Sequence, residues 1–335
     1  MNAEIYAEWL RRQGQRVIRT KSSYWHGQGW GVFQAFPYHW LIDPGRAELR
    51  DLMLRHGALA LRYSTPAPDG QIGDGQIEDG RNGDGRNQDA DRSRRQTRDS
   101  CYHVVYTGDD YGFETLGAWT RKNVRRGLRN CSIEPISSAR YLEQGWELRL
   151  DTLARQRRRV RETKRRWQSR YAAASGLDGF EFWAAEVRGR LAATLVTFPM
   201  DGWAYMLYQQ CHSDYLREHV NNALSFVVTQ TLIRRPHIHA IFYGMQSLDA
   251  PASVDEFKFR MGYEAKTVGQ RIAFHPCLAP LVNHYTHRAA RYLRAWNPAS
   301  RVLAKAEGLF RFGLAARDAS WSSATASPSL PESKA

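Results

Sequence analysis

The sequence predicts an α+β protein of two lobes, and three observations support that fold class. The chain has 335 residues, more than a single hydrophobic core usually serves. Hydrophobic residues make up 42% and aromatic residues 12% of it, which is enough to build sizeable cores and excludes a wholly disordered or fibrous protein. Finally, a run of strand patterns is followed by alternating helix and strand patterns, as in mixed sheets flanked by helices.

The first lobe is expected to span residues 1–140. A helix is predicted over 46–55, and the apolar segments 58–64 and 101–108 are predicted to pair as a β-hairpin. Between them, in the insertion 66–100, Asp-Gly recurs every five residues. The insertion has no aromatic residue and almost no aliphatic one, so it cannot bury enough surface to offset its ordering entropy. We therefore expect a disordered hairpin loop that is not a domain linker.

The second lobe is expected to span 141–275 and to begin with one long basic helix, 141–174. An antiparallel meander should follow, and then a helix that leads to a parallel strand. Beyond this lobe we expect a basic helical extension, 276–319, and a disordered tail, 320–335. The predicted elements after the basic helix are strands 180–187, 191–198 and 203–211, helix 221–234, strand 237–244, helix 254–261 and strand 264–274.

The charge balance favours anionic partners. Lys and Arg number 48 against 34 Asp and Glu, for a net charge of +14, which suits nucleic acid, a nucleotide or an acidic membrane face. The four cysteines have neither disulfide nor zinc-site spacing, so no metal is expected. The sequence shows no secretory signal and no apolar stretch long enough to cross a bilayer. It predicts a cytoplasmic protein.

Two helical segments concentrate arginines. Arg121, Arg125 and Arg129 recur every fourth residue in a helix predicted over 117–130 and form one positive stripe. Such stripes are either solvated surfaces or binding surfaces for a polyanion, such as the tRNA acceptor stem or anionic lipid head groups. No base-reading motif is present, so sequence-specific DNA binding is not expected. A second group, in the long basic helix, includes Arg157, Arg158 and Arg161.

The order of elements from the meander onward resembles the GNAT acyltransferase fold, and more closely its FemAB-like branch, in which two such lobes are fused. The resemblance covers roughly residues 20–275. In that branch a lysine that follows an aromatic residue precedes a Gly-aromatic pair, and Phe257-Lys258 with Gly262-Tyr263 matches this pattern. The other matching segments are VFQAFPYHWLIDP, RKNVRRGLRN, FEFWAAEVRGRLAATLVTF, VNNALSFVVTQTLI and FYGMQSLDAPASVDEFKFRMGY.

The resemblance implies two fused GNAT-like lobes and transfer of an acyl or aminoacyl group to an amine acceptor. The donor would be an acyl-CoA or an aminoacyl-tRNA. Its phosphates would meet the free N–H groups at the start of helix 221–234, together with Arg217, Asn221 and Asn222. Ordinary GNATs have a Gly-rich phosphate loop here, whereas SDYLREHVNN has no glycine. That departure favours the alternative of a non-catalytic protein that binds nucleic acid or an anionic membrane surface.

Three residues are candidates for the chemistry, each with a structural alternative. Lys258 would stabilise the oxyanion of a tetrahedral intermediate or the donor phosphate, or would extend over an apolar surface into solvent. Asp249 would act as a base or orient the amine, or would only cap the next helix. Tyr208 would face the slot between strands 203–211 and 237–244, or would be part of the core.

Overall fold

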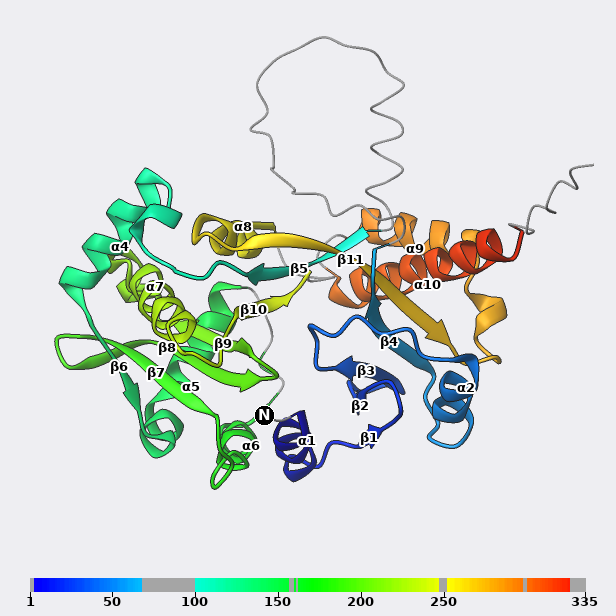
Figure 1. The fold of residues 1–335 in the computed structure, drawn as a ribbon, viewed down its shortest axis with the longest axis horizontal. Helices are drawn as coiled ribbons and strands as arrows, with labels where there is room; N and C mark the ends of the chain where they lie inside the picture. The colour runs from blue at the N-terminus through cyan, green and yellow to red at the C-terminus, as the bar shows by residue number, and fades with distance from the viewer. Residues whose placement is uncertain are drawn as a thin grey trace, which may run out of the picture. The chain divides into compact units, whose positions relative to one another are not determined.

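The computed structural model describes residues 3–67, 100–156, 160, 162–246, 252–297 and 300–325. Several parts of the sequence-based predictions lie outside the described residues. They are most of the insertion 66–100, the end of the predicted tail, and the residues Asp249, Arg157, Arg158 and Arg161. The chain forms an α+β fold in two compact units (Figure 1), and both are discontinuous in sequence, unlike the contiguous lobes expected. Unit 1 comprises the described residues of Met1–Ile18, Tyr102–Gln246 and Pro251–Lys266, and unit 2 those of Arg19–Cys101 and Thr267–Ala335.

Unit 1 is built on a mixed sheet with strand order β5-β10-β9-β8-β7-β6. Neighbouring strands from β6 to β9 are antiparallel, whereas β10 runs parallel to β9. Both the predicted meander and the predicted parallel crossover are confirmed. The strands are β5 Ser100–Tyr106, β6 Ser132–Ile136, β7 Glu181–Val187, β8 Arg190–Met200, β9 Trp203–Cys211 and β10 Ala240–Met245.

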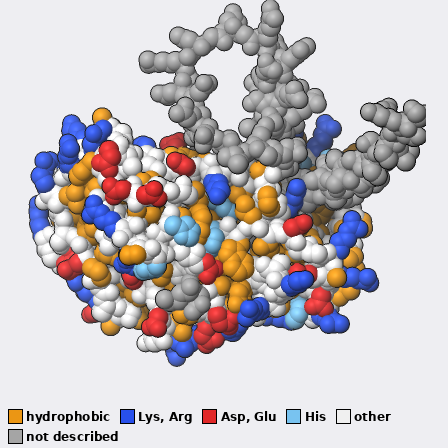
Figure 2. All heavy atoms as spheres, in the orientation of Figure 1, with side chains coloured by type: hydrophobic (Ala, Val, Ile, Leu, Met, Phe, Trp, Pro, Cys, Tyr) orange, Lys and Arg blue, Asp and Glu red, His pale blue; other side chains and the backbone are white. Residues whose placement is uncertain are grey.

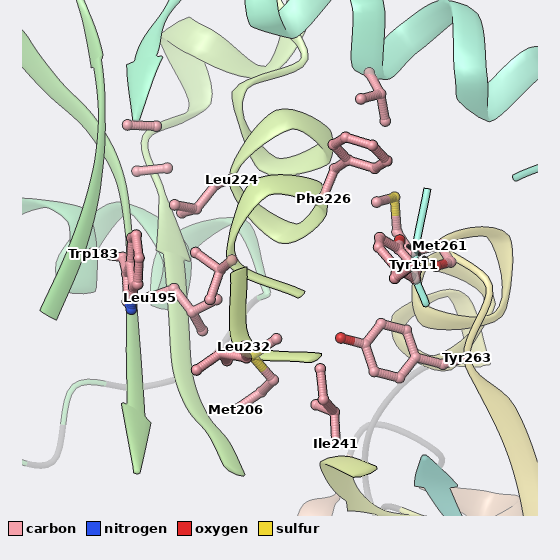
Figure 3. Close-up of a cluster of buried hydrophobic side chains, with 14 of the residues drawn as sticks. Tyr111, Trp183, Leu195, Met206, Leu224, Phe226, Leu232, Ile241, Met261 and Tyr263 are labelled. Carbon is pink, nitrogen blue, oxygen red and sulfur yellow. Dashed lines mark hydrogen bonds between the residues drawn. The ribbon is translucent and has the colours of Figure 1, made fainter. Parts of the chain in front are cut away.

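Helices cover both faces of this sheet. On one face α7 contributes Leu224 and Leu232 to the main core, and α4 contributes Val124. In Figure 3, Leu224 points toward the strands while Phe226 points toward Tyr111, whose ring lies 5.5 Å away. On the opposite face α5 and α6 pack an aromatic cluster against β7, β8 and β9. The helices are α1 Ala3–Arg12, α4 Ala118–Asn130, α5 Ser138–Arg155, α6 Lys164–Ala172, α7 Val220–Ile233 and α8 Ala252–Arg260, with a 3₁₀ helix, η2, over Ser213–Glu218.

The single helix predicted over 141–174 is wrong, because the chain there forms α5 and α6. The largely buried side chain of Glu162 lies between them and receives a hydrogen bond from Arg149 Nη2 (3.1 Å). Arg170 Nη2 lies 2.8 Å from the same carboxylate. In one straight helix Arg149 and Arg170 would be about 31 Å apart, so a shared contact with Glu162 requires the chain to turn. Thr163 then caps α6 by accepting the Arg166 N–H.

The predicted hairpin of 58–64 and 101–108 is also wrong. Strand β4, Ala60–Thr65, pairs with β3 and β11, and β5 pairs with β10. Strand β4 belongs to unit 2, whereas β5 crosses from unit 2 into unit 1 after Cys101. Two apolar strands with a polar segment between them look like a hairpin in sequence, but longer-range pairing determined their partners.

Unit 2 contains β2 to β4, most of β11 and, among the described residues, the α-helices α2, α9 and α10, while β1 spans the unit boundary after Ile18. Strands β2 and β3 are antiparallel, β3 and β4 are parallel, and β4 and β11 are antiparallel. The C-terminal helix α10 continues to Thr325, so the tail predicted from residue 320 begins with helix instead of disorder. No helix in the described part of the chain is long and apolar enough to cross a membrane. The elements are β1 Val17–Arg19, β2 Tyr24–Gly27, β3 Val32–Phe36, α2 Arg46–Leu54, β4 Ala60–Thr65, β11 Glu264–Phe274, α9 His284–Trp296 and α10 Arg301–Thr325.

Candidate functional site

Strands β9 and β10 of unit 1 pair briefly and then separate. Their parallel register covers only Ala240 to Phe242 opposite Trp203 to Tyr205. Strand β9 continues along β8 to Cys211, while β10 continues along β5 to Met245. Among the described residues, the facing edges of the two strands therefore lack strand partners beyond Tyr205 and Phe242. Backbone N–H groups on such an edge can bind a ligand carbonyl or an oxyanion.

Each strand carries a bulge just after it leaves the other. In β9 the register shifts between Met206 and Tyr208, and in β10 it shifts across Tyr243. A bulge reverses the side-chain alternation beyond it. Met206 therefore faces the core beneath α7, whereas Tyr208 faces α5 and α6, with its ring edge-on to Tyr171 at 5.5 Å. Tyr208 belongs to the aromatic cluster on that face, and burial raises its pKa.

Gln209 is the residue that the bulge directs toward α7. Its Nε2 donates to Ser225 Oγ (3.0 Å) and to Asn221 Oδ1 (3.3 Å) at the start of that helix. Its Oε1 accepts from the Tyr243 hydroxyl of β10. The pKa of Tyr243 is raised to about 12 by burial, so this phenol stays a neutral donor at ordinary pH. A polar network thus bridges the two strands where their backbones separate.

Lys258 of α8 lies beside this network and does not extend into solvent. Its Nζ donates to Asp255 Oδ1 at 2.7 Å, and both side chains are only 12% exposed. The same nitrogen lies 5.2 Å from the centre of the Tyr243 ring. A Cβ built on Gly244 of β10 would lie 3.8 Å from it. The ammonium is therefore held against the bulged end of β10.

Asp255 is the site residue that the sequence analysis missed. Its Oδ2 accepts a hydrogen bond of 3.0 Å from the hydroxyl of Tyr102 on β5, so the carboxylate is held by two donors. It lies three residues before Lys258 in a predicted helix, and that spacing places both on one face. The spacing alone could have suggested the pair. The contact with Tyr102 could not have been found, because it joins residues 153 positions apart.

The start of α7 holds the three residues expected to bind donor phosphates. Arg217 is exposed at the end of η2. The two asparagines contact protein: Asn221 Oδ1 accepts from Gln209, and Asn222 Nδ2 lies 3.6 Å from Met261 Sδ. His219 precedes the helix in a left-handed conformation and supplies no side-chain cap. Of the three residues, Arg217 is therefore exposed to solvent, whereas the side chains of Asn221 and Asn222 contact other residues of the protein.

The arginines of α4 are partly exposed. Arg125 and Arg129 are exposed, as is Lys122, whereas Arg121 is half-buried. The guanidinium of Arg125 lies over the Phe113 ring at 5.0 Å. Figure 2 shows Lys and Arg side chains gathered along the edge of unit 1 where Figure 1 places α4. The predicted stripe therefore forms a basic surface of four cationic side chains, which we call the α4 face: Lys122, Arg125, Arg126 and Arg129.

No group of three His, Cys, Asp or Glu side chains is placed to hold a metal ion within the part of the chain that the structure describes.

Comparison with known proteins identifies the fold. No protein-family model and no curated protein matches the sequence. The structure is similar to the crystal structure of FemX, with a TM-score of 0.51 and 10% identity over 82% of this chain and 92% of that one. A tandem GNAT protein from the clavulanic acid biosynthesis pathway matches with a TM-score of 0.43 and 12% identity over 77% of this chain and 82% of that one. L-PGS from Bacillus licheniformis matches with a TM-score of 0.46 and 10% identity over 84% of this chain and 94% of that one.

The FemX match carries the assignment, because it has the highest TM-score of the three and extends over most of both chains. The chain therefore has a fold like that of FemX.

Proposed function

We propose that this protein is an acyltransferase that moves an acyl or aminoacyl group from a thioester or ester donor to an amine. The observation that carries the proposal is the separation of β9 from β10 with the Lys258 ammonium held at its edge. An unpaired strand edge and a fixed cation together provide donors for a developing negative charge. The fold is also that of FemX.

In the proposed reaction the amine nitrogen attacks the donor carbonyl and forms the new C–N bond. The carbonyl electrons move to oxygen, and Lys258 with the free N–H groups of β9 stabilises this oxyanion. The intermediate then collapses and breaks the bond to the donor sulfur or oxygen. The amine loses its proton to a carboxylate or a water chain, and the leaving group takes up a proton. Asp249 is the proposed carboxylate, and Asp255 positions Lys258.

The donor is proposed to be an acyl-CoA or an aminoacyl-tRNA, since both carry phosphates beside an activated carbonyl. Arg217 and the first turn of α7, with Asn221 and Asn222, would meet the phosphates. The α4 face would contact a longer polyanion, such as the acceptor stem of a tRNA. A non-catalytic protein that holds nucleic acid or an anionic surface is the second candidate, and the same α4 face favours it.

The deciding experiment compares donors directly. Acetyl-CoA, longer acyl-CoAs and aminoacyl-tRNA are each titrated against the protein, and each is then incubated with a panel of primary amines. Mass spectrometry detects the new amide. We expect one donor class to bind and to yield amide. Binding of tRNA without any product would support the second candidate instead.

The α4 face provides a test of the polyanion. Changing Lys122, Arg125, Arg126 and Arg129 to Gln should weaken tRNA binding and reduce its salt dependence, by about one unit of slope for each phosphate that is no longer neutralised. The matched control changes two exposed arginines of the β7–β8 turn, Arg188 and Arg190, to Gln. Equal salt slopes for both variants would show that the α4 face is only a solvated surface.

A further inference from the structure

Helix α9 of unit 2 packs against α10 through its polar side. His287 Nε2 lies 3.1 Å from Glu307 Oε1, and Arg294 Nη1 donates to Glu307 Oε2 at 2.6 Å. Glu307 belongs to α10 and is buried. The small side chain of Ala290 completes the contact and is the buried residue of α9. Figure 1 shows the two helices side by side.

The apolar side of α9 points into solvent. Tyr285, Tyr292 and Trp296 are 86%, 71% and 84% exposed. With Ala289 they recur at spacings of four, three and four residues, so they form one stripe along the helix. Leu293 extends this stripe on one side and is also exposed. An amphipathic helix normally packs this face against its own core. In the part of the chain that the structure describes, α9 instead packs its polar face against α10 and leaves the aromatic face exposed.

Cationic side chains border the aromatic stripe. Arg288 and Arg291 are exposed on its other flank. The thirteen residues of α9, HYTHRAARYLRAW, include no Asp or Glu. An apolar stripe with a basic border and no acidic residue is complementary to a surface that is apolar inside and anionic at its boundary.

We propose that the outward face of α9 binds the surface of a membrane that contains anionic lipid, with the helix lying in the plane of the interface. Tyr and Trp suit this position, because each ring has an apolar body and a polar group that can remain hydrated at head-group level. Arg288 and Arg291 then contact lipid phosphates at the flank. A second copy of the chain fits the face poorly, because pairing two such helices would bring their arginines together with no acidic partner on α9. The proposal does not depend on the acyltransferase function.

Vesicle flotation with the full chain tests this inference. The probes are vesicles of phosphatidylcholine alone and of phosphatidylcholine with one quarter phosphatidylglycerol. We expect binding to the anionic vesicles, and the triple variant Tyr285→Ser, Tyr292→Ser, Trp296→Ser should reduce the partition coefficient by about tenfold or more. Trp30→Ser is the matched control, because Trp30 is 93% exposed and lies on a loop; it should bind like the wild type. Circular dichroism and melting confirm that each variant is folded.

A second pair of variants separates charge from apolar burial. Arg288→Gln with Arg291→Gln should weaken binding to anionic vesicles by about fivefold for each arginine, whereas Arg188→Gln with Arg190→Gln should leave it unchanged. Failure of the wild type to bind anionic vesicles would overturn the proposal, as would undiminished binding of the folded triple variant. A wild-type dimer that the triple variant abolishes, without any vesicle binding, would assign the face to a second copy of the chain.

Discussion

At the scale of single residues, substitutions in the Lys258–Asp255 pair should affect both turnover and the stability of the fold. Lys258→Met removes the ammonium, so it should lower turnover by about one to three orders of magnitude, the range for loss of one oxyanion donor. Among the described residues, it also leaves the buried Asp255 carboxylate with Tyr102 as its one remaining donor. Breaking a buried pair in this way costs about 3 kcal/mol or more. Both turnover and melting temperature should therefore fall, and both can be measured on the same preparation.

The double variant Lys258→Met, Asp255→Asn resolves the two effects. Replacing both charges removes the uncompensated carboxylate, so melting should return toward that of the wild type while turnover stays low. Lys266→Met, at an exposed position of β11, is the matched control for a lost ammonium. If turnover recovered together with melting in the double variant, Lys258 would be a structural residue only.

His26 of β2 should make the stability of unit 2 depend on pH. The ring is buried, with Nε2 2.9 Å from the Tyr38 hydroxyl, and burial lowers its pKa from 6.5 to about 4. Between these values the unfolded chain binds a proton that the folded chain does not, so stability rises with pH. The neutral His26 ring thus contributes about 3 kcal/mol to the unfolding free energy. This contribution is fully present above pH 6.5 and is lost as the pH falls toward 4.

Urea denaturation at pH 4.5 and pH 7.5 measures this contribution. His26→Gln should reduce the difference in unfolding free energy between the two pH values by most of the 3 kcal/mol expected. The exposed residue His284 provides the control His284→Gln. An unchanged pH dependence in the His26 variant would mean that the buried imidazole is not the group that titrates.

At the scale of elements, Gly127 sets how closely α4 approaches α7. A Cβ at this position would lie 2.5 Å from the backbone oxygen of His219 and 2.8 Å from Cβ of Ala223. Alanine normally stabilises a helix interior by about 1 kcal/mol relative to glycine. Here the clash is with backbone, which cannot rotate away, so Gly127→Ala should destabilise the protein by about 1–3 kcal/mol.

Chemical denaturation measures this effect, with Lys122→Ala, at an exposed position of the same helix, as the control. The control variant should be neutral or slightly stabilised. A stabilised Gly127→Ala protein would show that α4 lies farther from the start of α7 than the structure places it.

At the scale of the whole molecule, the Asp-Gly repeat lies in the sequence between β4 and β5. Deleting residues 70–89 leaves fourteen residues between Thr65 and Ser100, enough to span about 45 Å when extended. Because closure entropy changes slowly with loop length, the deletion should alter the unfolding free energy by about 1 kcal/mol or less. Calorimetry of the shortened chain checks this, and a loss of several kcal/mol would show that the deleted residues contribute packing.

Local patterns were sufficient for most elements of unit 1. The strands of the meander and the helix that follows them, α7, were predicted from the sequence and are present. Both signals depend only on residues close together in the chain, which is why they can be read from it. The resemblance of Phe257-Lys258 and Gly262-Tyr263 to the pattern of the FemAB-like branch pointed to the end of α8 as a candidate site. The hairpin, by contrast, failed because strand partners are chosen by contacts between distant residues.

The sequence by itself determined the order and type of most elements of the second lobe and the excess of basic charge, and its resemblance to the FemAB-like branch drew attention to Lys258. Only the tertiary structure decided which side chains meet. The β9 bulge placed Tyr208 in the aromatic cluster and directed Gln209 toward α7, and Tyr102 reached Asp255 across 153 residues. The face that α9 leaves uncovered was equally undetermined, since an amphipathic pattern does not specify which side packs inward. These outcomes depend on register and packing, which are properties of the folded chain and not of any local segment.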